Sequence, residues 1–383
     1  MSVESAAVEP RPETKRIVFL DLARAGAVLF MIQGHTIHQL LNPVYEDTPV
    51  FQAWLFLRGL TSCMFLLLSG FAFSVASDRY WDELKRPSRR LWRRLVRFTF
   101  FLGLGYLIHF PMGRFAHLKF ADAERWQSFL QVDVLQVVAV SLILLQALAS
   151  LLATRRQFAV VSAVTGGLIV LATPFSWSRD WTGDVPLWLA SYLSSETGSN
   201  FPFFPWGAFL FLGAALGMAY TQSRAGRTLE QTSGVFAGLG GILTVAGLVA
   251  FHLPVNPFDV IDPWRAGPAI FTIRLGCVLV LMSGFVYISR LIDQLPQYVN
   301  ALSQESLTIY VVHVAALYGS LWAPGLGELL GRHGLLSTFA WIAVLFVSMA
   351  VLAWVWNWTK RNRPLLTYAT RFAVAAGLIW PLL

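Results

Sequence analysis

The sequence is poor in charge and almost devoid of cysteine. Only 13% of its 383 residues are Asp, Glu, Lys or Arg, about half the share found in an ordinary soluble domain. The two cysteines, Cys63 and Cys277, lie in apolar segments and are interpreted as packing residues, because neither a disulfide framework nor a zinc-type spacing is present. No polar stretch is long enough to form a separate domain. The net charge of +8 therefore does not come from a basic soluble domain, and we expect no nucleic-acid partner.

Apolar segments fill the rest of the chain, most of them near the roughly 20 residues needed to cross a bilayer. Predicted spans lie at about 17–41, 51–76, 96–112, 132–153, 158–175, 204–221, 233–252, 268–288, 304–323 and 336–358. A shorter eleventh follows Pro364 and is interrupted by Arg371. The sequence thus predicts an all-α polytopic membrane protein, a bundle of 10–11 transmembrane helices, with residues 17–383 as one transmembrane domain.

The distribution of basic residues predicts the orientation. Residues 1–16 are polar and lack the features of a removable signal, so they are interpreted as a short cytoplasmic N-terminus before an uncleaved first span. With the N-terminus inside, most of the 29 Lys and Arg residues fall in inner loops, as the positive-inside rule requires. We therefore expect a multi-pass protein of a cell (inner) membrane.

The first span contains four ionisable side chains. Asp21, Arg24, His35 and His38 fall within an arc of about 100° on a helix, so one interior passage can contain them all. Arg24 and His35 are eleven residues apart, roughly 16 Å along the axis, and therefore lie at different depths. Because an ionisable group in a span is costly unless paired or hydrated, each is a candidate functional residue.

Further polar residues are predicted near the outer ends of other spans, where they would form an outer polar chamber. These are Arg58, His109, Asp133 and Arg274. In the ninth span, Ser306, Tyr310 and His313 are spaced by four and three residues and share one helix face.

The alternative for all these residues is pairing that holds helices together. It would join Asp21 to Arg24, and Asp133 to Arg58 or Arg274, with histidines bonded to backbone carbonyls. For Asp133 two roles stay equally open: it orients a histidine, or it neutralises an arginine. We favour it for Asp21 and Glu305, and we interpret His109 as a residue of the membrane interface.

The inner segment 78–97 carries a basic stripe at helical spacing. Its members are Lys85, Arg86, Arg89, Arg90, Arg93, Arg94 and Arg97. Two interpretations stay open: attraction to acidic lipid headgroups, worth about 1 kcal/mol per basic residue, or recognition of a phosphorylated cytosolic ligand by arginine forks.

Several motifs resemble those of membrane acyltransferases. FLDLARAGAVLFMIQGH holds Arg24 and His35 at the spacing of an Arg-x10-His signature, and MFLLLSGFAFS at 64–74 resembles a second-span motif. VDVLQVVAVSLILL, FPFFPWGAFLFLGAALG and SLTIYVVH resemble a leucine-glutamine span, a Pro-Trp span start and a Tyr-x-x-His. The order is similar to the acyltransferase-3 family and, more closely, to heparan-α-glucosaminide N-acetyltransferase-like bacterial membrane proteins. Ala25 departs from the usual Arg-Gly pair.

The resemblance implies transfer of an acyl group, often acetyl, from cytosolic acyl-CoA to an extracytoplasmic acceptor, commonly a sugar of a glycan or glycolipid. His35 would be the base or acyl carrier and Arg24 would position the donor. Further catalytic candidates are His38, Tyr310, His313 and Asp133. Donor-binding candidates are Arg24, Arg86, Arg89, Arg90, Arg93 and Ser69, and candidates for the substrate or oxyanion are Arg58 and Arg274.

The expected partners are the lipid bilayer, acyl-CoA and a carbohydrate acceptor, with no metal and with a homodimer left open. A secondary transporter or flippase for an anionic or glycan-linked solute is the alternative function, because buried charges and an aqueous chamber also serve transport.

Overall fold

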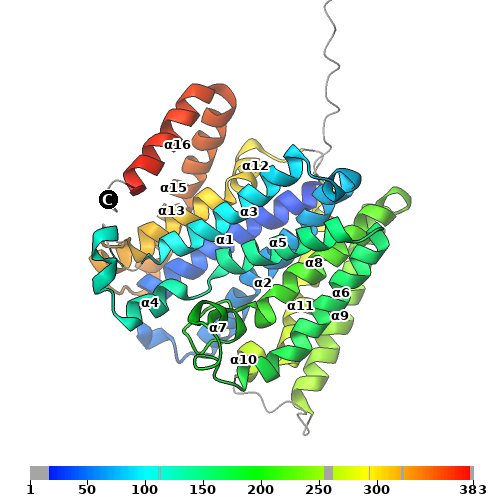
Figure 1. Ribbon diagram of the computed structural model, residues 1–383, viewed down its shortest axis with the longest axis horizontal. Coiled ribbons are helices and arrows are strands. Elements are labelled where there is room, and N and C mark those ends of the chain that lie inside the picture. The colour runs from blue at the N-terminus through cyan, green and yellow to red at the C-terminus, as the bar shows by residue number, and fades with distance from the viewer. Residues whose placement is uncertain are drawn as a thin grey trace, which may run out of the picture.

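The computed structural model describes residues 17–379 apart from 111, 113, 254–261, 293 and 321–322, and the side chains of residues 378 and 379. The predicted cytoplasmic segment 1–16 therefore lies outside the described residues. Helices dominate throughout (Figure 1), and the described residues contain no β-strand, only isolated bridges between Leu41 and His333 and between Ser320 and Ala323.

Eight of the described helices are long and apolar enough to cross a membrane. They are α1 (Val18–Leu40), α2 (Pro49–Asp78), α5 (Val134–Leu151), α6 (Arg155–Trp177), α8 (Phe203–Ser223), α9 (Leu229–His252), α11 (Pro268–Ser289) and α15 (Leu335–Asn362). The remaining helices are α3 (Arg89–Ile108), α4 (Ala123–Leu130), α7 (Leu187–Leu193), α10 (Pro263–Ala266), α12 (Gln297–Gln304), α13 (Ser306–Tyr318), α14 (Leu326–Leu330) and α16 (Pro364–Ile379).

The all-α membrane architecture is confirmed, while three expected spans differ in detail. α3 begins at Arg89, so that its first turns carry the basic stripe. The segment expected at 304–323 corresponds to the 13-residue α13, which begins after Glu305 and is preceded by the separate short helix α12. The eleventh, α16, has 16 residues. Each is helical as expected, but charge or length sets it apart from the eight apolar helices.

The centre of the bundle is made by α2 and α8, whose backbones approach closely. A Cβ on Gly70 would overlap the carbonyl oxygen of Leu210, and a Cβ on Gly213 would overlap that of Leu67. Ser74 Oγ also donates a hydrogen bond to Ala214 O across this contact, at 2.6 Å. Small residues allow such close packing in membranes, where no hydrophobic force drives helices together.

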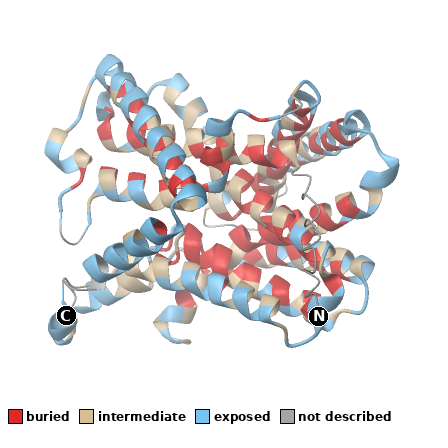
Figure 2. Cartoon of the chain, turned by 90° about the horizontal axis from the view of Figure 1, so that it is seen from above, coloured by how far each residue is buried: buried red, intermediate tan, exposed pale blue. Residues whose placement is uncertain are grey.

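Residues on the outer helices are mostly exposed or half-buried, whereas buried residues gather toward the centre (Figure 2). Only 17% of the α9 span and 22% of the α15 span are buried within the protein, against 61% for α8. Residues of this kind on a membrane protein face lipid, whereas the buried residues gather around α1, α2, α5 and α8. The bilayer therefore supplies the solvent for a large part of the surface.

The two ends of the bundle differ in character. The basic end holds the start of α1 and the turn after α2, where Arg155 pairs with Asp78 at 2.7 Å and Lys85 donates to Ala153 O. At the opposite, loop end, α4, α7 and α10 gather (Figure 1). Because successive long helices alternate in direction, the C-terminal half of α1 and the N-terminal half of α2 both lie toward the loop end.

Two acidic residues hold helices together, as predicted. Asp21 accepts a 2.7 Å hydrogen bond from Ser303 Oγ and lies 3.7 Å from Arg24 Nη1. Glu305, only 2% exposed, pairs with Lys360 and accepts from Asn357 Nδ2 at 3.0 Å. Both pairings join α12 or its C-cap to neighbouring helices, so the structure confirms the structural role favoured for these two carboxylates.

Candidate functional site

A cavity of about 900 Å³ occupies the loop-end half of the bundle. Its walls come from α1, α2, α4, α8, α10, α11 and α13, from the end of α3 and from the start of α5. The predicted site residues that line it are His35, His38, Arg58, Asp133, Arg274 and Tyr310. The polar chamber expected from the positions of these residues in their spans is therefore a real cavity, of the size that encloses small-molecule ligands.

His35 lies in the cavity wall and is hydrogen-bonded to His313, which lies outside the lining. His35 Nδ1 is 2.9 Å from His313 Nε2, and the two rings are nearly parallel, at 11°. His313 is completely buried, and its Nδ1 lies 2.7 Å from the carbonyl oxygen of Ile309. The two histidines thus form a chain that runs from the cavity to the backbone of α13.

The backbone carbonyl determines where the protons lie in this chain. A carbonyl oxygen only accepts, so His313 Nδ1 carries a proton and donates it. In neutral His313 the other nitrogen, Nε2, is then an acceptor, which requires His35 Nδ1 to be the donor. The Nε2 atom of a neutral His35 is left without a proton. The geometry therefore presents a free imidazole lone pair on a residue that lines the cavity.

Two tyrosines of α13 lie near the histidine pair, and the end of this helix places one of them. α13 stops at Gly319, which has a φ of +85° that other residues rarely adopt. The ring of Tyr318, in the last turn, stands edge-on to His35 with centroids 5.7 Å apart. Tyr310 lines the cavity one turn before His313, and its ring centroid is 6.1 Å from that of His313.

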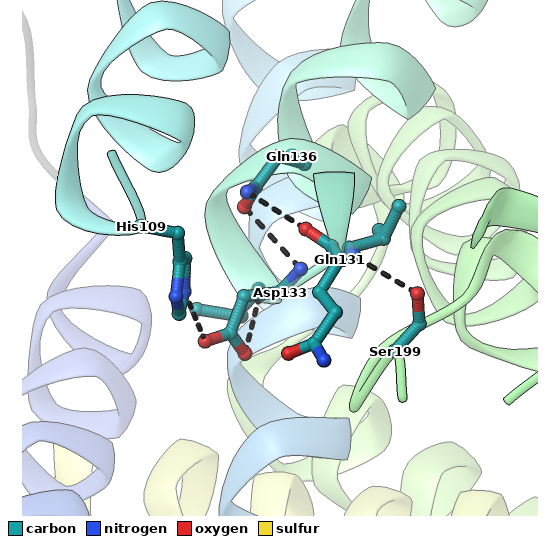
Figure 3. Close-up of polar contacts among 7 residues, drawn as sticks. His109, Gln131, Asp133, Gln136 and Ser199 are labelled. Carbon is teal, nitrogen blue, oxygen red and sulfur yellow. Dashed lines mark hydrogen bonds and ion pairs between the residues drawn. The ribbon is translucent and has the colours of Figure 1, made fainter. Parts of the chain in front are cut away.

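A second histidine in the cavity has a carboxylate partner. His109, the C-cap of α3, has its Nε2 3.3 Å from Asp133 Oδ2 (Figure 3). Asp133 is also the N-cap of α5 and accepts from Val134 N, while Gln136 completes a capping box by accepting from Asp133 N. This cap, tied through Val132 N to Ser199 Oγ, fixes the carboxylate in place.

Of the two roles left open for Asp133, orienting a histidine or neutralising an arginine, the structure shows the first. Asp133 faces His109 rather than Arg58 or Arg274, because its side chain is held at the helix N-terminus by its own capping hydrogen bonds. The expectation that His109 lies at the membrane interface is wrong. His109 is drawn into the cavity wall with Asp133. The Asp at the start of an apolar run was the available signal, since an N-cap carboxylate marks where a helix begins.

Arginines outnumber carboxylates in the cavity wall. Arg125 pairs with Asp122, and Arg265 approaches the backbone oxygens of residues 199 and 200. Arg58 and Arg274 have no acidic partner within 4 Å among the described residues. They lie against indole rings instead, Arg58 5.7 Å from the Trp54 centroid and Arg274 5.9 Å from that of Trp206.

The predicted donor-binding residues lie away from this cavity. The cavity extends along α1 as far as Ala27, one helical turn short of Arg24. Ser69 donates to Phe65 O within α2 and is likewise not a lining residue. Arg86 precedes α3, and Arg89, Arg90 and Arg93 form its first turns at the basic end. Asp21 and Arg24 thus lie at a different depth from His35 and His38, as their spacing along the helix predicts, and Arg24 Nη1 is 3.7 Å from Asp21 Oδ1.

A comparison with known protein families matches residues 16–253 to the catalytic domain of heparan-α-glucosaminide N-acetyltransferase. No curated protein and no solved structure gives a match. The matched range includes His35, His109 and Asp133 but ends before α13, which supplies His313. Because the match covers more than half of the chain, this multi-pass membrane protein belongs to the heparan-α-glucosaminide N-acetyltransferase catalytic-domain family.

Proposed function

We propose that this protein transfers an acyl group, most simply acetyl, from acyl-CoA to a hydroxyl or amine of a sugar acceptor within the cavity. The observation that carries the proposal is the hydrogen-bonded chain from His35 through His313 to Ile309 O. It leaves the Nε2 lone pair of His35 available to a bound acceptor. The family name supports acetyl as the group that is transferred.

The chemistry follows from that lone pair. His35 Nε2 accepts the proton of the acceptor as its oxygen or nitrogen bonds to the thioester carbon, and the carbon–sulfur bond breaks as CoA leaves. The protonated imidazole then returns the proton to the CoA sulfur. His313 keeps the ring of His35 in one orientation throughout, because its own proton is held by a backbone carbonyl. The same lone pair could carry the acyl group itself in a two-step transfer.

Charge distribution supports a donor that approaches from the basic end. The stripe at the start of α3 offers guanidinium groups for phosphates, and Arg24 lies between that end and the cavity. By the positive-inside rule the basic end is cytoplasmic, so the cavity would open to the extracytoplasmic side. A donor arm that reaches His35 must pass the helical turn from Arg24 to Ala27, where the cavity ends.

Purified protein in detergent tests the proposal with radiolabelled acetyl-CoA and a panel of amino sugars. We expect His35→Gln to lower the rate of transfer by about 10²–10⁴-fold, the range of general-base catalysis, while acetyl-CoA still binds. His252→Gln is the matched control, because His252 is an exposed histidine at the end of α9 that does not line the cavity. Label retained on denatured protein in the absence of acceptor would identify the two-step route.

Two outcomes would refute the proposal. The first is a folded wild-type protein that does not bind acetyl-CoA, which would favour transport of a solute through the cavity. The second is a His35→Gln variant as active as His252→Gln. Equal and large losses in His109→Gln and Asp133→Asn, with His35→Gln unaffected, would keep the acyltransferase but move the base to His109.

A further inference from the structure

We propose that the cavity contains a subsite for an anionic group, such as a carboxylate, sulfate or phosphate, carried by the acceptor. Arg274 on α11, Arg58 on α2 and Trp206 on α8 form it. This inference rests on the proposed function and adds the chemical class of its acceptor. Some hydrogen-bond donors in the cavity wall have no acceptor among the described residues.

Two of these donors are buried and have no partner among the described residues. They are Arg274 Nε and Trp206 Nε1. Trp206 is only 6% exposed, and the guanidinium carbon of Arg274 lies 5.9 Å from its ring centroid, so the two donors line one part of the cavity. A buried donor without a partner destabilises the protein, because it has given up its hydrogen bonds to water. A ligand oxygen that accepts from both would remove this cost.

Arg58 brings a second positive charge to the same cavity. A Cβ on Gly34 of α1 would meet Arg58 Cγ at 3.2 Å, so the glycine leaves room for the side chain to lie along α1. The Arg274 Nη2 atom lies near Gly59 of the same helix as Arg58, 3.9 Å from where a Cβ of residue 59 would be, which is ordinary van der Waals contact. The side chains of Arg58 and Arg274 therefore both line the cavity beside α2.

The charge of the cavity is unbalanced without an anion. Its lining contains four arginines, of which Arg125 pairs with Asp122 outside the lining, and Asp133 is the single carboxylate in that set. That carboxylate is already engaged by His109 and by its helix cap. Unpaired charges inside a membrane protein are expensive and usually mark a ligand path. Arginine forks bind planar carboxylates and phosphate or sulfate oxygens through paired hydrogen bonds, which fits the class of group proposed.

The position of the subsite favours the acceptor over the donor as the source of the anion. In acyl-CoA the whole pantetheine arm separates the phosphates from the thioester, and the basic stripe at the other end of the bundle offers cations for them. Arg58 and Arg274 instead share one cavity with His35. An acidic group held there lies on the same molecule as the hydroxyl or amine that reaches His35 Nε2.

Anion binding can be measured without any acyl transfer. We would follow thermal unfolding of the detergent-solubilised protein in sulfate, phosphate and chloride, for wild type, Arg274→Gln and Trp206→Phe. We expect sulfate and phosphate to raise the midpoint of the wild type and to bind about tenfold or more weakly to Arg274→Gln, because a hydrogen bond to a charged group is lost. Trp206→Phe keeps an aromatic ring but removes the indole N–H, and it should also weaken sulfate and phosphate binding. Arg274→Lys keeps the positive charge and should retain part of the anion binding that Arg274→Gln loses. Arg179→Gln, at an exposed ion pair outside the cavity, is the control.

A second arm identifies the source of the anion. We would compare glucosamine with glucosamine 6-phosphate as acceptors and measure acetyl-CoA affinity in the same variants. The proposal expects Arg274→Gln to raise KM for the phosphorylated sugar about tenfold more than KM for the neutral sugar, with acetyl-CoA affinity unchanged. Equal anion affinity in wild type, Arg274→Gln and Arg179→Gln would overturn the subsite. Weakened acetyl-CoA binding with both sugars unaffected would assign it to the donor and overturn the acceptor class. Neither result depends on whether His35 is the base.

Discussion

Replacement of His313 by phenylalanine tests the proton arrangement at His35 most directly. The variant removes the acceptor of His35 Nδ1 and keeps an aromatic ring in the fully buried site on α13. Without that acceptor, the tautomer of His35 with a free Nε2 loses a hydrogen bond worth about 1–3 kcal/mol. The alternative tautomer carries its proton on Nε2 and has no lone pair for the acceptor, and it becomes more favourable relative to the first by that same amount.

The expected loss of rate follows from that energy. At about 1.4 kcal/mol per factor of ten, the active tautomer should fall by roughly 5- to 150-fold relative to the inactive one. Acetyl-CoA affinity should stay unchanged, because His313 does not line the cavity. Phenylalanine is slightly larger than histidine, so we expect the variant to be destabilised by about 1–3 kcal/mol as well.

The assay compares initial rates of acetyl transfer, acetyl-CoA affinity and thermal unfolding in wild type, His313→Phe and His313→Gln. Glutamine supplies a side-chain oxygen that accepts from His35 Nδ1, so this variant should keep more activity than phenylalanine. Nitrogen-15 shifts of the His35 ring report which nitrogen carries the proton. A folded His313→Phe protein with the wild-type rate, or with an unprotonated Nε2 still in place, would refute the reasoning.

Three further variants test other parts of the structure. Asp133→Asn keeps the helix cap but removes the charge beside His109. We expect the transfer rate to fall by less than tenfold and the melting temperature to stay within a few degrees of wild type. A loss of rate above 10²-fold would make the His109–Asp133 pair the catalytic base. Gly70→Ala should prevent the close packing of α2 against α8 and lower the melting temperature severely. Gly167→Ala is the control, because a Cβ there meets nothing within 4 Å, and it should melt like wild type. Similar melting temperatures of the two variants would contradict the close helix contact. Lys360→Met leaves the buried Glu305 without its ion-pair partner and should lower the free energy of unfolding by about 3–5 kcal/mol. The Lys360→Met/Glu305→Gln double variant should recover part of this stability. A single variant as stable as wild type would show that the ion pair contributes nothing.

The predicted spans agree with the structure where apolar length alone decides the outcome. α1, α2, α5, α6, α8, α9, α11 and α15 all fall on predicted segments. The ninth predicted span, 304–323, is shorter in the structure, where α13 begins after Glu305 and ends at Tyr318. The buried Glu305 at its start depends on partners far away in the chain. Lys360 and Asn357, both on α15, stabilise the carboxylate there, and no local pattern identifies them.

Helical spacing also predicted which first-span residues share a face, but not which of them share a cavity. His35 and His38 line the cavity, whereas Asp21 and Arg24 pair near the basic end. Depth along the helix separates the two groups, and the sequence gives that depth. Whether space continues between them depends on side chains from other helices, which only packing decides.

The sequence by itself determined that this chain spans a membrane as helices, which end is basic, and that His35 is a candidate for the central chemistry. Each of these follows from local composition or from spacing along one helix. Only the tertiary structure decided that His313 orients His35, that Asp133 faces His109, and that Arg274 and Trp206 have unmet donors in one cavity. These contacts join helices that are far apart in the chain, and their geometry depends on how whole helices pack.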